Sequence, residues 1–548
     1  MKLKPTLLFA SLTASCLLIT ACGDKAPTSD KGATKSSSVK SANKIADVVI
    51  VNGVEPESLD PQKASDIPSF SIHRQMFLGL TASDKEGKTV PAMATEWEST
   101  DDKVWVFKLR NDVKWSDGSP VTAHDFVFAL QRLTDPKTAS PYGTYLVDAK
   151  VVNAQAISEG KAQPSTLGVK ALDDYTLEIT TTDPVPYLAD LMLLPVTFAT
   201  PKQAIEQHGN KWTDAANIVV NGAYKLHDWQ VNGHIILKRN KSYFDDANTK
   251  INSVAFLPVT AQAAMSRYKA GEVDFSGVPA EMFKDLKAEL PDEVVVTPTL
   301  CTSYLEYNTK KAPLDDVRVR KALSMALDRD LITKEVLGRG EESSYQLTPH
   351  YTQGMSQVLP DWASLPMQER AKMANDLLAQ AGYSQQNPAK VEILYSTSEG
   401  GKRLTSAISS LYKQYLPNAQ ISVINQEWKM FLDARHQGNF QISFPSWCAD
   451  YNEPSTFLNL MRTGSSNNTS FYSNPEYDRL MNSTLSVGAT DESRRQAYVE
   501  AERLLQKDAA IMPLFTGVSP SLIKTYLKGI SPNDPLKNWY IKDWQIAE

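Results

Sequence analysis

Segments with the pattern of β-strands alternate with segments with the pattern of helices along most of this chain. Residues 391–395 and 421–424 are rich in strand-forming side chains, and they flank a helical pattern at 404–415. A strand, a helix and a strand in this order predict a βαβ unit, in which the helix crosses over between two parallel strands. Because the alternation recurs along the chain, the sequence predicts an α/β fold.

Further elements are expected on both sides of this unit. Thr122 is expected to cap a helix that runs to Leu133, with Asp125 placed to satisfy its first amide groups. Apolar residues at helical spacing predict helices at 317–327 and 373–381, and Gly382 ends the second of these. Strands are expected at 48–51, 105–109, 176–182 and 235–238.

The body of the chain is too long for a single hydrophobic core. About 500 residues predict two or three domains. The sequence has no internal repeat, and no linker rich in proline and serine follows residue 46. We therefore expect the domains to exchange segments rather than to follow one another along the chain.

The first residues have the pattern of an export signal. Lys2 and Lys4 precede an apolar run at 6–20, which is too short for a stable membrane span and ends just before Cys22. This resembles a bacterial lipoprotein signal at 1–21, with Cys22 as the lipidated residue; the alternative is a plain secretory peptide. Residues 22–45 are small and polar and predict a flexible tether.

Export limits how the four cysteines are used. Cys16 would leave with the signal and Cys22 would carry lipid, which leaves Cys301 and Cys448 in an oxidising compartment. We expect a disulfide between them; two unpaired buried thiols are the alternative. A loop this long would stabilise the fold by about 5 kcal/mol in the entropic account of disulfides.

The stretch at 447–454 places the carboxylate of Asp450 among aromatic side chains. Asp450 follows Trp447 and Cys448 and precedes Tyr451. Its charge suits a bound cation, and the aromatic side chains suit the exclusion of water. The alternative is a surface turn with a solvated aspartate.

Composition and motifs disfavour several classes of function. A net charge of -6 disfavours a broad nucleic-acid surface. Ala82 stands where a phosphate loop ending in Gly87-Lys88-Thr89 needs its first glycine, and the seven histidines never pair at metal-ligand spacing. A dyad of Cys448 with His436 is disfavoured by the expected disulfide. We expect no metal, no cofactor and no catalysis; an exported hydrolase is the remote alternative.

Several motifs together resemble one known family. Residues 91–97, 105–110, 115–126, 221–224 and 315–323 resemble the signature of the family 5 solute-binding proteins of ABC importers. The match extends over the order of segments from about 46 to 548. Residues 300–302, 425–428, 435–438 and 447–454 are most similar to those of family members that bind oligopeptides.

The resemblance implies an architecture. It is a two-lobed periplasmic-binding-protein clamp of α/β type, in the class with an extra third domain. The first lobe would be discontinuous, built from 46–77, 202–300 and 517–548. The extra domain would occupy 78–201, and the second lobe 301–516.

The resemblance also implies a function and a site. An extended oligopeptide would lie between the lobes, bound through its backbone and through its free amine at Asp450, and would pass to an ABC import permease. Arg435 and Glu306 would form a charged pair lining a side-chain pocket. The protein would be a periplasmic monomer held at the membrane only by its lipid, at either the inner or the outer membrane. The expected ligand contacts are Asp450, Trp447, Cys448, Arg435, Tyr142, Glu306 and Trp428.

Two positions depart from the family pattern. Members that bind short peptides hold the ligand carboxylate partly with an arginine, where this chain has Phe444, and with a histidine, where it has Gly401. Lys402 or Arg403 would substitute, or the carboxyl end of the ligand would lie elsewhere. A murein peptide is therefore an alternative ligand, and haem and glutathione, which are also bound within the family, remain open.

Overall fold

The computed structural model describes residues 44–465, 467–531 and 533–547, without the side chains of residues 399, 428 and 429. The expected signal at 1–21, the lipidation site Cys22 and nearly all of the tether at 22–45 lie outside the described residues. Within the described part, every helix is too short or too polar to cross a lipid bilayer.

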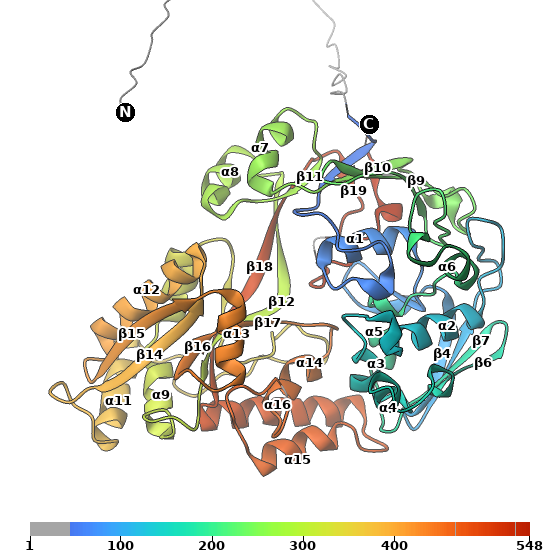
Figure 1. The fold of residues 1–548 in the computed structure, drawn as a ribbon. Coiled ribbons are helices and arrows are strands. Elements are labelled where there is room, and N and C mark those ends of the chain that lie inside the picture. Colours follow the sequence, from blue (N-terminus) through green and yellow to red (C-terminus); the bar gives the residue numbers. More distant parts are fainter. Residues whose placement is uncertain (1–43, 466, 532, 548) are drawn as a thin grey trace, which may run out of the picture. The chain divides into compact units, whose positions relative to one another are not determined.

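A mixed sheet of twelve strands forms the centre of the fold (Figure 1). Its strands β1 (Val48–Val51) and β10 (Ser253–Leu257) run parallel, as do β14 (Ala389–Ser396) and β15 (Ala419–Gln426), whereas the long central strands β12 (Val294–Tyr307) and β18 (Ile511–Ile523) pair antiparallel. In addition, β13 (Glu342–Ser343) pairs with β18 and β17 (Ser446–Cys448) pairs with β12. In spatial order the main path is β15 (Ala419–Gln426), β14 (Ala389–Ser396), β16 (Ile442–Phe444), β12 (Val294–Tyr307), β18 (Ile511–Ile523), β11 (Phe275–Gly277), β1 (Val48–Val51), β10 (Ser253–Leu257), β9 (His234–Arg239) and β8 (Tyr224–Gln230).

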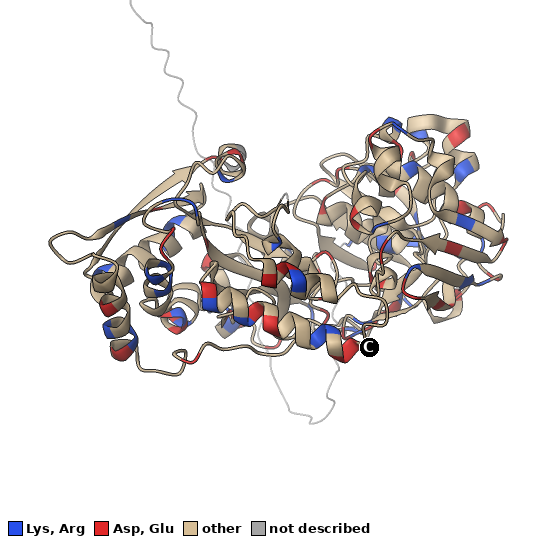
Figure 2. Ribbon diagram, turned by 90° about the horizontal axis from the view of Figure 1, so that it is seen from below, with Lys and Arg blue, Asp and Glu red and all other residues tan. Residues whose placement is uncertain are grey.

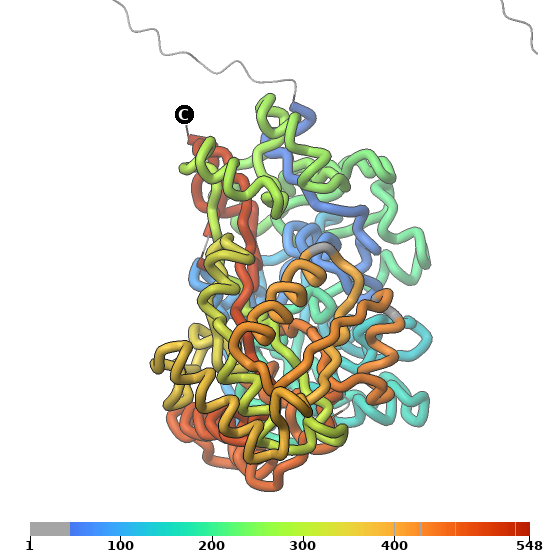
Figure 3. Tube along the Cα trace, turned by 90° about the vertical axis from the view of Figure 1, so that its left-hand side faces the viewer, coloured from blue at the N-terminus to red at the C-terminus, as the bar shows by residue number. Residues whose placement is uncertain are grey.

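Two strands, β12 and β18, are far longer than the others and lie side by side (Figure 3). They pair antiparallel from Val294↔Leu522 to Glu306↔Ile511. The register is irregular between Pro298 and Thr302, and again between Ser303 and Tyr304. Strands β12 and β18 therefore link the part of the sheet that contains β16 to the part that contains β11. The regular pattern of hydrogen bonds between them is interrupted near residue 300.

The βαβ unit expected from the sequence is present. Strands β14 and β15 pair parallel in register from Ala389↔Ala419 to Ser396↔Gln426, and α12 (Glu399–Tyr415) connects them. The helix buries Leu404, Ile408 and Tyr412 in an apolar core. Helices α9 (Val317–Met325) and α11 (Met367–Gln380) pack on each other near this end of the sheet (Figure 1).

A separate sheet of four strands lies within residues 94–180. Its order is β4 (Ala94–Thr100), β5 (Val104–Leu109), β7 (Thr176–Thr180) and β6 (Val169–Asp173). Helix α2 (Ala123–Thr134) packs on it and begins with the expected capping box, in which Asp125 Oδ2 accepts from the Thr122 amide at 2.8 Å. The buried side chains of this sheet, such as Phe107 on β5, join the same apolar core as Val48 and Phe256 of the large sheet.

Two small sheets and a further set of helices complete the described fold. Two-stranded pairs are formed by β2 (Thr81–Ser83) with β3 (Thr89–Pro91) and by β19 (Leu527–Lys528) with β20 (Gln545–Ile546). The other helices are α1 (Ile67–Met76), α3 (Tyr145–Asp148), α4 (Ala154–Ser158), α5 (Leu188–Leu191), α6 (Lys202–His208), α7 (Ala261–Lys269), α8 (Phe283–Glu289), α10 (Arg329–Leu331), α13 (Trp428–His436), α14 (Ser455–Leu458), α15 (Pro475–Ser483) and α16 (Asp491–Asp508).

Acidic and basic residues are interspersed along the helices (Figure 2). On α16, for example, Arg495 pairs with Glu492 and Arg503 with Glu500, both one helical turn apart. Such exposed pairs contribute little to stability. Their mixture agrees with the small net charge of the chain.

Candidate functional site

The stretch around Asp450 begins as a strand joined to the centre of the large sheet. Strand β17 pairs antiparallel with β12, with Cys301 opposite Cys448 and Thr302 opposite Trp447. The expected disulfide between Cys301 and Cys448 is confirmed, with an S–S distance of 2.10 Å. The turn that carries Asp450 therefore starts from a strand held both by hydrogen bonds and by a covalent bond.

The turn after β17 is held by its own polar groups. The Asp450 amide donates to Thr456 Oγ1 at 3.2 Å, and the Ser455 amide donates to Glu453 Oε2 at 2.7 Å. The ring of Tyr451 stacks on that of Tyr187 at 5.3 Å between centroids, with the planes 10° apart. These contacts fix the backbone on both sides of the Asp450 side chain.

The carboxylate of Asp450 accepts no hydrogen bond from any described residue. Its side chain keeps access to solvent, yet surrounding protein atoms desolvate it. This desolvation, and then the negative charge of Asp148 on α3, raise the pKa of Asp450 to about 6. Two neighbouring carboxylates that repel one another favour the approach of a cation.

Aromatic side chains lie beside this carboxylate. Burial, and then the charge of Asp450, raise the pKa of the Tyr142 hydroxyl. The ring of Tyr142 packs on Phe70 of α1 at 6.0 Å and edge-on to Tyr145 at 5.8 Å. Trp447 is half-buried, and its indole Nε1 is enclosed without a hydrogen-bond partner among the described residues. An unused indole N–H is a donor that a bound ligand can satisfy.

Glu306 and Arg435 form the expected ion pair, and it is buried. Arg435 Nε donates to Glu306 Oε2 at 2.9 Å. Ser443 Oγ donates to the same oxygen at 2.8 Å, and Thr469 Oγ1 donates to Glu306 Oε1 at 2.6 Å. Because both carboxylate oxygens have partners inside the protein, the pair is a satisfied network within the fold. Its role toward a ligand stays a prediction.

The two positions at which the resemblance led us to look for a ligand-carboxylate anchor, Phe444 and Gly401, carry no charged side chain. Phe444 lies on β16 opposite Tyr395 of β14. A Cβ added at Gly401 would lie 2.9 Å from Cδ2 of Tyr395, so the tyrosine ring fills the space that a side chain at 401 would need. Lys402 and Arg403 are exposed on the first turns of α12. Trp428 begins α13, and its side chain is outside the description.

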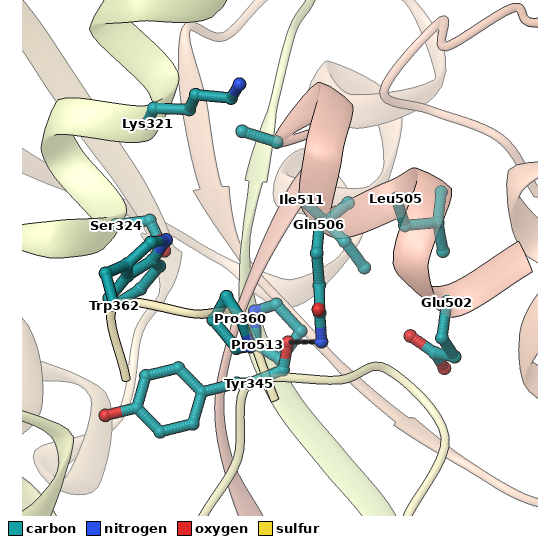
Figure 4. A pocket seen from close by; sticks show the side chains of 11 residues that line it. Lys321, Ser324, Tyr345, Pro360, Trp362, Glu502, Leu505, Gln506, Ile511 and Pro513 are labelled. Carbon is teal, nitrogen blue, oxygen red and sulfur yellow. Dashed lines mark hydrogen bonds between the residues drawn. The ribbon is translucent and has the colours of Figure 1, made fainter. Parts of the chain in front are cut away.

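One enclosed hollow lies away from these residues, beside α9 and α16 (Figure 4). It is lined by Trp362, Tyr345 and Glu502, and Gln506 Nε2 donates to the Tyr345 carbonyl at 3.1 Å within it. Its volume of about 20 Å³ suits a single water molecule. It therefore offers no room for a solute.

The fold and this site define a class of protein. The chain belongs to the bacterial extracellular solute-binding proteins of family 5, whose middle-region family model matches residues 88–469. It is 47% identical over 500 residues to the periplasmic oligopeptide-binding protein OppA of Salmonella typhimurium, covering 91% of this chain and 92% of that protein. The family expected from the sequence motifs is thus confirmed.

Solved structures agree with the expected clamp architecture. The unliganded open form of the periplasmic murein tripeptide-binding protein MppA is 39% identical, has a TM-score of 0.84, and is matched over 92% of this chain and 98% of its own. Haemophilus influenzae OppA in complex with the peptide RPPGFSPFR is 43% identical, with a TM-score of 0.73 over 91% and 99% of the two chains. The α/β two-lobed fold is therefore established for this chain.

Asp148 is the residue of this site that the sequence did not indicate. It lies at the end of α3 in the segment 78–201, far from Asp450 in sequence, and its neighbours form no recognisable motif. Burial raises its own pKa, while the charge of Lys150 lowers it. Only the fold brings the two carboxylates within electrostatic range.

Proposed function

We propose that this protein captures oligopeptides outside the cytoplasm by their free N-terminus and their backbone, and delivers them to an ABC import permease. The observation that carries the proposal is the Asp450 carboxylate. It accepts no hydrogen bond from any described residue, is partly desolvated by neighbouring protein atoms, and has another carboxylate as its charged neighbour. An ammonium group would relieve both the desolvation and the repulsion.

The backbone of the ligand would contribute binding affinity that does not depend on the amino-acid sequence of the peptide. A peptide that lies extended beside a sheet can form main-chain hydrogen bonds as an added strand does. Trp447 and Tyr142 would enclose its first residue, and the Trp447 indole would gain the partner it lacks. Breadth of ligand choice follows because main-chain groups are common to all peptides.

The domain division also forms part of the proposal. We place the first lobe at 46–77, 202–300 and 517–548, the extra domain at 78–201 and the second lobe at 301–516. Both boundaries between the lobes fall on β12 and β18, beside the register break between Pro298 and Thr302. Gly517 lies at this point on β18, where an added Cβ would come within 3.1 Å of Thr299 Oγ1. A small change of backbone angles here would reorient one lobe against the other.

We further propose that the mature protein is a monomer of the periplasm, attached only through lipid on Cys22. The periplasmic location of the OppA relatives supports this assignment. Metabolic labelling with a palmitate analogue tests it. Wild-type protein should incorporate the label, whereas Cys22→Ala should not and should remain soluble after osmotic release. Equal labelling of the two proteins would contradict the lipid assignment.

Calorimetry with the peptide Ala-Ala-Ala tests the main proposal. Asp450→Asn should weaken binding by at least about 30-fold, since removing one partner of a hydrogen-bonded charge pair that the ligand covers costs about 2 kcal/mol or more. Acetylation of the peptide amine should weaken binding to the wild type by a similar factor. An unchanged affinity in the variant would refute the assignment of Asp450.

A murein peptide is the second candidate ligand. Phe444 and Gly401 stand where family members that bind short peptides carry carboxylate anchors, and the murein tripeptide-binding protein is among the structures similar to this chain. Thermal shifts measured with the murein tripeptide and with Ala-Ala-Ala separate the two. A shift with the murein tripeptide alone would favour the second candidate.

We propose that ligands leave the site unchanged. Mass spectrometry of a peptide incubated with purified protein should show only the intact peptide, and hydrolysis products that persist after further purification would contradict this view.

A further inference from the structure

A hollow of about 230 Å³ opens beside helix α1, in the part of the chain assigned to the first lobe. It lies where α1, the ends of β1 and β11, and the chain after residue 536 come together. Among its lining residues are Arg74 on α1, Ser519 on β18, and Lys537, Trp539 and Trp544 near the C-terminus. It is large enough for much more than ordered water.

Two cations, Arg74 and Lys537, line this hollow, and neither forms an ion pair with a described carboxylate. Arg74 Nε is enclosed and has no hydrogen-bond partner among the described residues. Lys537 Nζ donates to Ser519 Oγ at 3.1 Å. An ammonium and a guanidinium both have several donors, so an anion in this hollow would find hydrogen bonds as well as charge.

The carboxylate near these cations is engaged elsewhere. Asp534 accepts from the Leu536 amide at 2.9 Å and from the Asn538 amide at 2.7 Å. Its charge acts on both Arg74 and Lys537 but neutralises only one of two positive charges. Burial lowers the pKa of Lys537, and an added anion would offset that desolvation.

Aromatic rings form the other wall of the hollow. Phe275 meets Trp539 edge-on at 4.9 Å between centroids and stacks on Trp544 at 6.0 Å. At the end of β11, Gly277 leaves its side of the hollow open, since an added Cβ would have only Ala261 Cβ within 4 Å, at 3.8 Å. The hollow thus combines an anion site with an apolar surface, as the last residue of a peptide requires.

Helix α1 connects this hollow with the surroundings of Asp450. Ile67, Ser71 and Arg74 of α1 face the hollow. On the same helix, Phe70 contacts the ring of Tyr142, whose hydroxyl pKa is raised by burial and then by the charge of Asp450. One rigid helix therefore borders both the proposed amine site and the pair of cations.

We infer that Lys537 and Arg74 bind the α-carboxylate of the captured peptide, and that the aromatic wall at Phe275, Trp539 and Trp544 receives its last side chain. This inference rests on the proposed function, and it gives the carboxyl end of the ligand a partner in the first lobe. It also accounts for the loss of anchors at Phe444 and Gly401. A ligand held by its amine near Asp450 and by its carboxylate at Lys537 would be recognised at both ends.

A thermodynamic cycle between ligand and protein tests the inference. The probes are alanine peptides of two to five residues that end in either phenylalanine or alanine, each as the free acid and as the amide. Binding is measured by calorimetry to wild type, Lys537→Gln and the matched control Lys528→Gln, whose lysine is exposed outside the hollow. Melting curves establish that each variant is folded.

For the best-fitting length, the wild type should bind the acid about 10- to 100-fold more tightly than the amide, as expected for a hydrogen-bonded charge pair. Lys537→Gln should lower this ratio several-fold, because only Arg74 then remains to bind the carboxylate, while leaving the affinity for the amide unchanged, and Lys528→Gln should keep the wild-type ratio. A second variant, Gly277→Leu, should weaken peptides ending in phenylalanine more than those ending in alanine, because its side chain would occupy the hollow.

Two results overturn the inference and differ from failure of the proposed function. They are equal binding of acid and amide by the wild type, and a ratio unaffected by Lys537→Gln. In either case, if Asp450→Asn still binds the peptides much more weakly than the wild type, the assignment of Asp450 as the amine site holds and only the carboxylate site is wrong. Absence of binding of every peptide by the wild type would overturn both proposals.

Discussion

Peptide binding should weaken in mild acid because the proposed amine anchor titrates there. In the ligand-free protein the pKa of Asp450 is raised to about 6 by desolvation and by Asp148. An ammonium ligand requires the ionised carboxylate, so binding favours the deprotonated form and lowers this pKa. Affinity should therefore be full above pH 7 and should fall as the pH drops through 6.

The size of the effect follows from the fraction of Asp450 that is ionised. With a pKa of about 6, that fraction falls roughly tenfold between pH 7 and pH 5, so the dissociation constant rises by about tenfold. A carboxylate with an ordinary aspartate pKa of roughly 3.9 would give almost no change over the same range. The two cases are readily separated by experiment.

Calorimetry with Ala-Ala-Ala from pH 5 to pH 7.5 measures the effect. Repeating the titration at pH 6 in buffers of different ionisation enthalpy should show about half a proton released for each peptide bound. Asp148→Asn removes the neighbouring charge, so it should move the fall in affinity to lower pH. Asp450→Asn should remove the pH dependence along with most of the binding. An affinity that stays level from pH 7 to pH 5 would refute the reasoning.

Three further predictions concern stability, measured by urea unfolding. Arg435→Met leaves Glu306 buried without its cation and should lower the free energy of unfolding by about 3–5 kcal/mol, whereas adding Glu306→Gln should recover part of the loss; no recovery would argue against the pair. Replacing both Cys301 and Cys448 by serine should lower it by up to about 5 kcal/mol, and an unchanged midpoint would contradict this. Thr122→Ala removes half of a capping box and should cost about 1 kcal/mol, while Thr122→Ser should cost less.

Local features of the fold were predictable because neighbouring residues determine them. The βαβ unit at 389–426 follows from its hydrophobic periodicity, and the start of α2 follows from Thr122 and Asp125. Helix α11, expected at 373–381, begins at Met367 instead. The polar side chains of its first turn carry little apolar periodicity, so the pattern alone underestimated its length.

Most features that depend on distant segments were not predictable from one sequence. The disulfide between Cys301 and Cys448 is the exception, because only two cysteines remain after export. By contrast, nothing in the residues around Asp148 or Lys537 indicates that they approach Asp450 or Arg74. The alternation of strands and helices also gave no sign that β12 and β18 would carry a single sheet through both expected lobes. Such juxtapositions arise from topology, which periodicity does not encode.

The position of β18 in the sheet determines when, during synthesis of the chain, the large sheet can be completed. It is the last strand of the large sheet along the chain, yet it lies between β12 and β11. Until residues 511–523 are present, those two neighbours expose unpaired edges, and the two halves of the sheet share no hydrogen-bonded strand. The large sheet therefore cannot close into one until the C-terminal part of the chain has been made, because β18 is the strand through which its two halves are hydrogen-bonded.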